Sequence, residues 1–241
     1  MTNGVVIGAY WGDRPESIES CVERLAGCLD SLADIEARFG TWYSKKSSRK
    51  AGSGASLSHT AETLSQILLA GRNRRDFGGT VNEQLGFSMN AWNGDYERSA
   101  SLSVFCGGYA GVAGLVNHFV ISTPDSLDEL VEAMDLATAK RLLTTIAGSW
   151  RPDWATIATD EMREEQRPLP RQPIVGIATY LGRARHVTGD NLPGWASIEM
   201  VDHGTLLLVD TDPRETLRHR TLVLAGALGD ALRPAPLVAA E

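Results

Sequence analysis

The N-terminal part of the chain begins with a short apolar run, and after it the apolar residues follow the spacing of a helix. Residues 5–11 are apolar and rich in strand-forming types, which predicts a buried strand. Apolar residues then recur at steps of three and four, which predicts an amphipathic helix from residue 18 to about residue 38, ended near Gly40. Asp13 and Glu16 precede this pattern with the spacing of a capping box, so we expect them to cap the helix.

The next part of the chain predicts a loop, a helix and a three-stranded meander. Residues 41–54 are basic and rich in Ser and Gly, as expected of a loop, and residues 58–70 have a helical pattern. Three strand-forming segments follow, and Asn93-Gly94-Asp95 is a strong turn signal between the first two. An antiparallel meander is the simplest way to connect them. The expected strands are residues 85–92, 99–106 and 115–121.

A long helix is predicted after this meander. Thr123-Pro124 places proline at its first position, and the pattern ends near Gly148. A charged helical segment at residues 160–167 leads into Pro168-Leu169-Pro170, the best linker candidate in the chain. The remaining expected elements are a strand at residues 174–181, a hairpin of residues 196–201 and 205–209, and a last helix that a capping sequence at residues 212–215 opens and that reaches about residue 232.

Together these elements predict an α+β fold with an antiparallel or mixed sheet and flanking helices. The linker divides the chain into residues 1–167, which hold the meander and the long helix, and a smaller α+β part, residues 171–241. Residues 7–12 loosely resemble residues 177–182, so we expect each part to open with a similar buried strand. We expect the two parts to pack as one unit.

The charge of the chain restricts its partners. With 23 Lys and Arg against 30 Asp and Glu, the net charge is −7, which argues against nucleic acid and against an anionic membrane surface. Three cysteines in 241 residues do not form a disulfide framework. No targeting segment and no apolar run long enough to span a membrane is visible, so we expect a cytoplasmic protein.

Signatures of catalytic, cofactor and metal sites are missing from the sequence. It has no Gly-rich nucleotide loop, no nucleophile elbow and no His or Cys pair at metal-ligand spacing. We therefore expect no enzyme, no cofactor and no metal. A small hydrolase or transferase that uses a Cys106–His118 pair or a carboxylate pair stays as an alternative.

Several of the six tryptophans stand beside acidic residues at predicted turns. Tryptophan is usually a core residue, but at loop edges it is also a frequent hot spot of protein interfaces. Between residues 121 and 165, ten carboxylates stand against four basic side chains, which suits a solvated helix or a docking surface for a basic partner. As candidate partner contacts we select Trp11, Asp13, Glu16, Trp92, Asp95, Tyr96, Asp153 and Trp154.

Short segments in the first two-thirds of the chain resemble a known family. They are residues 7–17, residues 85–87 with 92–94, residues 106–109 with Asn117, and residues 150–154. Their sequences are similar to those of the immunity protein 52 family of bacterial polymorphic toxin systems. The resemblance implies an antitoxin that binds and neutralises a secreted effector, often a restriction-endonuclease-like nuclease, and so protects the producing cell. A scaffold protein of a secretion-linked operon is a further interpretation, and it would not rescue cells from a toxin.

Overall fold

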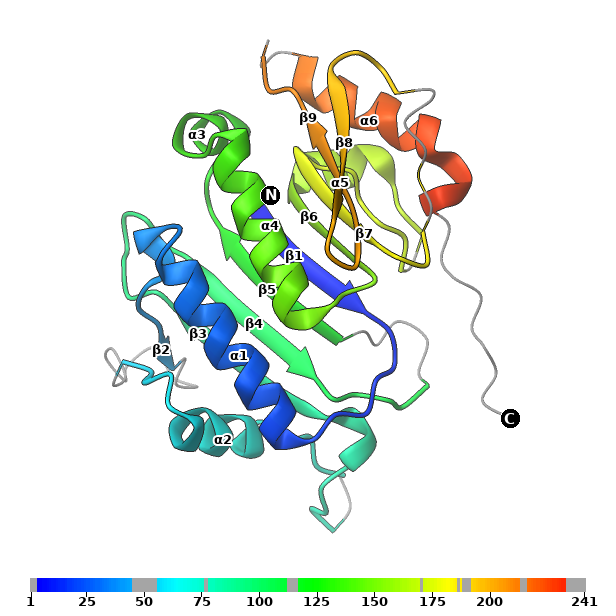
Figure 1. Ribbon diagram of the computed structural model, residues 1–241. Helices are drawn as coiled ribbons and strands as arrows, with labels where there is room; N and C mark the ends of the chain where they lie inside the picture. Colours follow the sequence, from blue (N-terminus) through cyan, green and yellow to red (C-terminus); the bar gives the residue numbers. More distant parts are fainter. Residues whose placement is uncertain are drawn as a thin grey trace.

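A sheet to which the described residues contribute nine strands forms the centre of the molecule in the computed structural model (Figure 1). In the sheet the strands follow the order β2-β3-β4-β5-β1-β6-β7-β9-β8, and each neighbouring pair is antiparallel. The strands are β1 (Val5–Trp11), β2 (Tyr43–Ser44), β3 (Phe87–Trp92), β4 (Ser101–Cys106), β5 (Asn117–Thr123), β6 (Trp154–Thr159), β7 (Ala178–Gly182), β8 (Ala196–Val201) and β9 (Gly204–Val209). The structure describes residues 4–44, 56–75, 78–111, 117–169, 171–185, 187, 192–212 and 216–232.

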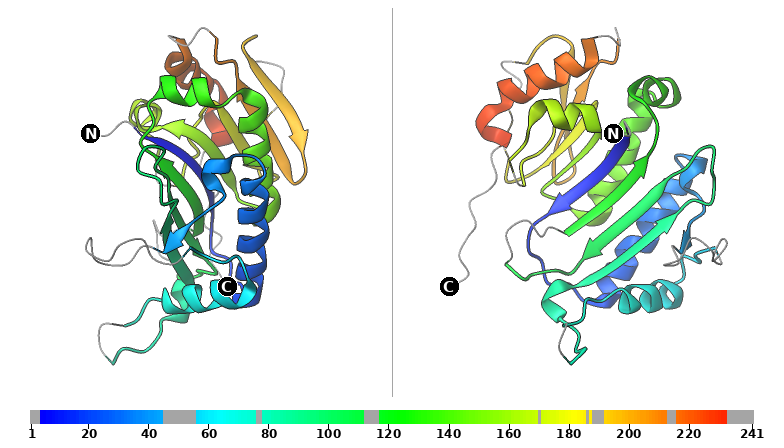
Figure 2. Two further views of the ribbon diagram at one scale, coloured as in Figure 1. Left: turned by 90° about the vertical axis from the view of Figure 1, so that its left-hand side faces the viewer. Right: turned by 180° about the vertical axis from the view of Figure 1, so that it is seen from behind.

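Helices cover the two faces of this sheet unequally. The helices are α1 (Ile18–Ala33), α2 (Ala61–Ala70), α3 (Leu127–Ala133), α4 (Leu136–Trp150), α5 (Asp160–Gln166) and α6 (Leu217–Leu228). Helices α1, α2 and α4 lie on one face, while α5 and α6 lie on the other, where they pack against β6 and β9 (Figures 1 and 2). The fold is therefore α+β, as the sequence predicts. No helix in the described part of the chain is long and apolar enough to cross a membrane.

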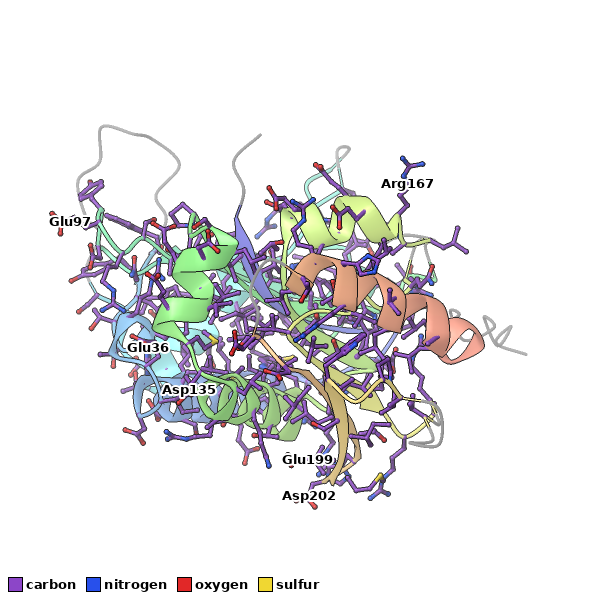
Figure 3. The ribbon with its side chains drawn as sticks, turned by 90° about the horizontal axis from the view of Figure 1, so that it is seen from above. Glu36, Glu97, Asp135, Arg167, Glu199 and Asp202 are labelled. Carbon is purple, nitrogen blue, oxygen red and sulfur yellow. The ribbon has the colours of Figure 1, made fainter. Side chains whose placement is uncertain are left out.

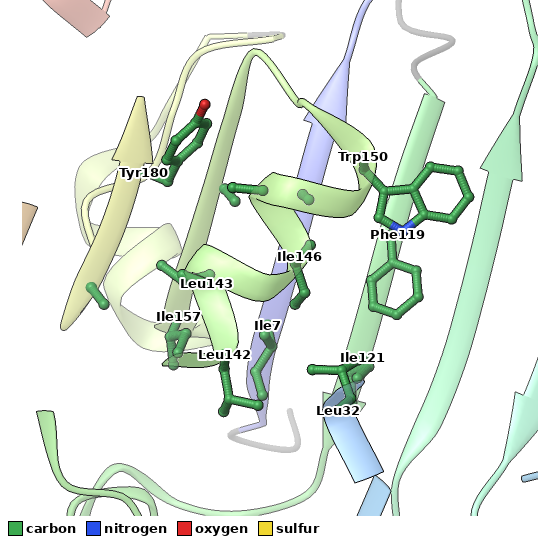
Figure 4. Close-up of a cluster of buried hydrophobic side chains, with 14 of the residues drawn as sticks. Ile7, Leu32, Phe119, Ile121, Leu142, Leu143, Ile146, Trp150, Ile157 and Tyr180 are labelled. Carbon is green, nitrogen blue, oxygen red and sulfur yellow. The ribbon is translucent and has the colours of Figure 1, made fainter. Parts of the chain in front are cut away.

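The main core lies between the sheet and the α1–α4 layer. Figure 4 shows Trp150 of α4 beside Phe119 of β5, and their ring centroids are 6.0 Å apart. Ile146 and Leu142 continue the same face of α4 toward Ile7 of β1, and all of these side chains are buried. Each large apolar side chain buried here stabilises the fold by about 1.5–3 kcal/mol relative to an exposed one. The helical layer is thus held to the sheet by this apolar contact.

The burial of alternate residues shows which strands have an uncovered face. In β5 buried and half-buried residues alternate without exception, as expected of a strand covered on one face only. All residues of β6, β7 and β9 are buried, as expected of strands covered on both faces. The sheet is therefore covered on both faces at β6, β7 and β9, whereas its N-terminal half keeps one face that no described helix covers.

The first helix begins at Ile18, as predicted, but its predicted cap and its predicted end are wrong. Ser17 is the N-cap of α1 and accepts from the Ser20 amide at 3.3 Å, so Asp13 and Glu16 do not form the capping box. The segment before Ser17 stays outside the helix because the Arg14 amide donates to the Gly108 carbonyl at 2.9 Å. The helix ends at Ala33, and a separate 3₁₀ turn, Ala37–Phe39, comes before Gly40.

The predicted long helix is two helices. Ser126 caps α3 and forms a capping box with Glu129, so Pro124 does not occupy the first helical position. Met134 then has an extended backbone, and Asp135 caps α4 by accepting from the Thr138 amide at 2.7 Å. Ser126 and Asp135 are both good N-cap residues, so a second helix can begin at Asp135, although the spacing of the apolar residues does not reveal the break.

The other predicted elements have mixed outcomes. The β3–β4–β5 meander and the β8–β9 hairpin are confirmed, while α2 begins three residues later than predicted. Strand β6, which is buried on both faces, is missing from the prediction. It pairs with β1 and with β7, so the sheet continues across the predicted linker. Several predicted features fall wholly or partly outside the described residues: most of the basic loop 41–54, Pro170, and residues 213–215 of the last capping sequence.

Candidate functional site

The eight candidate contact residues fall into two groups at opposite ends of the sheet. One group surrounds the C-terminal end of β1, where Trp11 pairs with Asn117. The other group lies at the loop between β3 and β4. Trp92 pairs with Ser101, Ser101 pairs with Ser122, and Ser122 pairs with Val6, so Trp92 is level with the start of β1. The first group is Trp11, Asp13, Glu16, Asp153 and Trp154, and the second is Trp92, Asp95 and Tyr96.

The two tryptophans of the first group are packed inside the molecule. Trp11 is 2% exposed and stacks on Trp150 with ring centroids 5.2 Å apart. Trp154 is 7% exposed and stacks on Tyr10 at 4.3 Å. The Tyr10 ring also lies over Gly8, where an added Cβ would come within 2.6 Å of the tyrosine oxygen. These rings hold β1 and β6 in place, and a role as partner contacts stays a prediction.

The three carboxylates of the first group fasten the connection between β1 and α1. Asp153 accepts from the Gly12 amide at 2.9 Å, and Asp13 accepts from the Gly111 amide at 3.0 Å. Glu16 lies 3.1 Å from the Nε atoms of both Arg14 and Arg24 and is only 7% exposed. Each of the three carboxylates therefore has at least one contact within the chain that holds this connection in place.

A pocket of about 390 Å³ opens beside Glu16, at the N-terminal end of α1. Its wall depends on Gly86, which has a φ of +57° and whose added Cβ would come within 2.3 Å of the Cys106 carbonyl oxygen. Charges of both signs line it, so it has no clear preference for an anion or a cation. The lining residues are Pro15, Glu16, Ser17, Arg72, Glu83, Gly86, Phe87, Gly107 and Tyr109.

The second group sits on a loop, residues 93–100, whose conformation is held by side chains. The buried Asn93 amide oxygen accepts from the Ala100 and Asp95 amides, and its nitrogen donates to the Arg98 carbonyl at 2.8 Å. Asp95 accepts from the amides of Arg98 at 3.0 Å and Glu97 at 2.8 Å. These hydrogen bonds to the charged form hold the pKa of Asp95 below its ordinary value.

Arg38, in the 3₁₀ turn Ala37–Phe39, holds the same loop in place. Arg38 is only 9% exposed, donates to the carbonyls of Arg98 and Ser99 at 2.8 and 2.7 Å, and forms an ion pair with Asp125. Partial burial raises the pKa of Asp125, but hydrogen bonds from Arg38 and Thr123 outweigh it and leave the pKa below its ordinary value. The loop is thus tied to the end of β5.

Three aromatic side chains meet at this loop, and we call them the aromatic corner: Tyr43, Trp92 and Tyr96. The Tyr96 ring is 88% exposed and meets the edge of Trp92 at 5.2 Å between centroids. Tyr43 pairs with Trp92 across β2 and β3, with centroids 6.2 Å apart. A large aromatic ring held in this exposed position is typical of interface hot spots.

The aromatic corner adjoins the uncovered sheet face, which we call the open face. Strands β1, β5, β4, β3 and β2 pair side by side, and directly opposed residues point to the same side of the sheet. The residues of the open face therefore lie in three cross-strand rows. Figure 2, seen from behind, shows these strands with no helix in front of them. The rows are Val6–Ser122–Ser101–Trp92–Tyr43, Gly8–Val120–Ser103–Asn90 and Tyr10–His118–Phe105–Ser88.

The open face has no Asp, Glu, Lys or Arg among these row positions. Its middle row, Gly8–Val120–Ser103–Asn90, has no aromatic side chain, and aromatic side chains stand at two of its borders. Depletion of charge and enrichment of Tyr, Trp and Phe are marks of interface cores rather than of solvent-facing sheets. Sequence reasoning missed this surface, although a signal was present: in β4 and β5 the half-buried positions that alternate with buried ones carry no Asp, Glu, Lys or Arg, and all of them except Val120 are polar.

The alternative Cys106–His118 pair is not formed. Phe105 lies opposite His118, so Cys106 points to the other face of the sheet, and the His118 ring lies 3.1 Å from the Ser103 hydroxyl. The neighbouring sulfur of Cys21 and burial raise the pKa of the Cys106 thiol, which makes it a poor nucleophile. Among the described residues, no group of three His, Cys, Asp or Glu side chains could hold a metal ion.

Comparison with known proteins identifies the family. The family model of Immunity protein 52 (Imm52) matches residues 4–240. This chain belongs to the Imm52 family. The resemblance seen in the sequence is thereby confirmed, and the family implies an immunity protein whose partner is a toxin.

A solved structure has a similar fold. The Pseudomonas aeruginosa T6SS protein PA0821 superposes with a TM-score of 0.58 at 12% identity, over 96% of this chain and 73% of that one. At this identity the likeness concerns the fold alone. Comparison with curated proteins gives no match.

Proposed function

We propose that this Imm52 protein binds its cognate secreted toxin directly, one to one, in the cytoplasm of the producing cell, and that the toxin is a restriction-endonuclease-like nuclease. The match of the family model to nearly the whole chain carries this proposal. A surface depleted of charge and bordered by aromatic rings supports it, because direct inhibition requires a stable protein interface.

The charge of the chain supports a nuclease as the toxin. A DNA-cutting enzyme needs a positive cleft to bind phosphates. A partner with a net charge of −7 is attracted to such a cleft and associates with it quickly. The immunity protein can then neutralise the enzyme by covering the cleft or by binding beside it.

Co-expression tests the proposal. The C-terminal domain of the protein encoded immediately upstream is expressed in a bacterial host, alone and together with this chain. We expect growth arrest and fragmented chromosomal DNA with the domain alone, and normal growth when both are present. With purified proteins, DNA cleavage should stop at a molar ratio near one, because the proposed inhibition is stoichiometric.

Two results would contradict the proposal in different ways. Continued arrest in the presence of well-expressed chain would refute neutralisation. Rescue from a domain that leaves DNA intact would refute the nuclease while keeping the immunity function. Inhibition at far below one equivalent would indicate catalytic inactivation instead of binding.

A further inference from the structure

We infer that the open face, together with the aromatic corner, is the surface on which the toxin docks, and that the toxin presents a basic segment to the aromatic corner. The inference rests on the proposed function, since it locates the partner of that function. It selects the second group of candidate contacts and leaves the group at the end of β1 to the packing of the fold.

The composition of the open face argues that it is covered in the working state of the protein. Charged residues make up 22% of the chain, and the solvent face of an antiparallel sheet is normally among the places where they gather. Here Asn90 is exposed and its row neighbours Ser103 and Val120 are half-buried, yet no row position is charged. Uncharged surface of this kind is what the centre of an interface requires.

The size of the open face suits the centre of a protein interface. Two of the thirteen row positions, Gly8 and Phe105, are buried. Each same-face position of a sheet occupies about 30 Å², so the other eleven positions amount to roughly 330 Å². A standard protein complex buries about 800 Å² on each partner. The rows therefore supply about two-fifths of the contact, and neighbouring loops must supply the rest.

The aromatic corner provides the adjoining contact. Tyr96 stands out from the loop, while Asn93, Asp95 and Arg38 hold the loop backbone in one conformation. Binding through this loop costs little conformational entropy because the backbone is ordered beforehand. The exposed Tyr96 ring is thus well placed to act as the anchor of the interface.

The charge around the aromatic corner indicates the chemistry of the occupant. Among the described residues, two guanidinium groups lie here, those of Arg38 and Arg98, and both are already in ion pairs with carboxylates. In Figure 3, Glu97 projects at the outer margin of the molecule, and Glu36 lies on the same side. Four carboxylates stand against these two guanidinium groups, so the described residues here carry a net negative charge. Such a charge attracts Lys or Arg side chains, which also bind the faces of Trp and Tyr rings. The four carboxylates are Glu36, Asp95, Glu97 and Asp125.

Pairs of variants with matched controls test the surface. Asn90→Arg places a long charged side chain in the middle of the open face, and Ser197→Arg does the same on the exposed edge strand β8. Tyr96→Ala removes the exposed ring, and Met200→Ala removes a similarly exposed side chain elsewhere. All four positions are exposed, so each variant should fold, which circular dichroism checks.

The probe is the C-terminal domain encoded immediately upstream, made inactive by substitution at its own catalytic residue. Calorimetric titration of the full-length chain should give at least tenfold weaker binding for Asn90→Arg and for Tyr96→Ala. Ser197→Arg and Met200→Ala should stay within twofold of the unmodified chain. Bound toxin should also slow amide hydrogen exchange in residues 93–99 and β4 while leaving β8 unchanged.

The charge of the occupant has its own test. Glu97→Lys should weaken binding at low salt by at least fivefold, and the difference should shrink as salt screens it. Glu23→Lys, on the exposed side of α1, changes the net charge equally and should have less than twofold effect. Stronger binding by Glu97→Lys would refute a basic segment at the aromatic corner.

The outcomes separate the two proposals. If the unmodified chain binds the domain and both Asn90→Arg and Tyr96→Ala bind equally well, the docking surface is wrong and the immunity function stands. If the unmodified chain neither binds the domain nor rescues cells from it, both proposals are wrong together.

Discussion

At the scale of single residues, buried polar side chains hold the loops that surround both candidate groups. Asn93 satisfies the backbone of the β3–β4 loop, and Asn117 does the same where β4 leaves the sheet. The Asn117 amide accepts from the Gly108 amide at 2.8 Å and donates to the carbonyls of Gly12 and Gly108 at 2.7 and 2.9 Å. Each of these side chains makes hydrogen bonds to backbone amides and carbonyls that have no partner strand in the turn.

Replacing Asn117 with Ala should lower the free energy of unfolding by about 3 kcal/mol, because a buried donor, a buried acceptor and a partly buried acceptor lose their partner. Urea denaturation followed by circular dichroism measures the loss. Asn90→Ala is the control, since Asn90 is exposed, and it should change the free energy by less than about 0.5 kcal/mol. A loss below about 1 kcal/mol for Asn117→Ala would mean that water replaces the amide.

At the scale of elements, the ion pair of Arg38 and Asp125 connects the 3₁₀ turn Ala37–Phe39, the β3–β4 loop and the end of β5. These segments are far apart in the sequence, yet they form one rigid corner. Because Arg38 also donates to two loop carbonyls, its orientation by Asp125 affects the aromatic corner directly.

The lowered pKa of Asp125 predicts a pH dependence of stability. A carboxyl with a depressed pKa stabilises the folded state fully above its unfolded value of 3.8, and this contribution is lost as the pH falls through the lower folded value. Asp125→Asn should therefore be less stable than the unmodified chain at pH 7, and the two should converge below pH 3.8. Urea midpoints across this range measure the effect. A constant difference down to the acid limit would contradict the assignment.

At the scale of the whole molecule, the sheet joins the two parts that the Pro-rich linker separates. Strand β1 lies near the middle of the sheet with β6 on one side and β5 on the other, and β6 continues to β7. Helix α4 packs against β1, β6, β7 and β9, so the same helix contacts strands of both parts. We propose that the two parts form a single cooperative unit.

A cooperative unit should unfold in one transition. Urea denaturation followed by tryptophan fluorescence and by far-ultraviolet circular dichroism should give coincident curves. Five of the six tryptophans precede the linker and one, Trp195, follows it, so fluorescence of a chain whose only tryptophan is Trp195 reports on the C-terminal part separately. A midpoint for that variant different from the midpoint by circular dichroism would show that the parts unfold independently.

The sequence by itself determined the features that depend on local periodicity. These include β1, the meander, the β8–β9 hairpin and the α+β class, because alternation, helical spacing and turn residues are visible within a few residues. The tertiary structure alone decided the rest. Trp11 and Tyr96 were equal candidates for partner contact in the sequence, yet they end at 2% and 88% exposure, because helices cover the one and leave the other in solvent. Strand β6 and the open face likewise follow from coverage of the sheet, which contacts between distant segments determine.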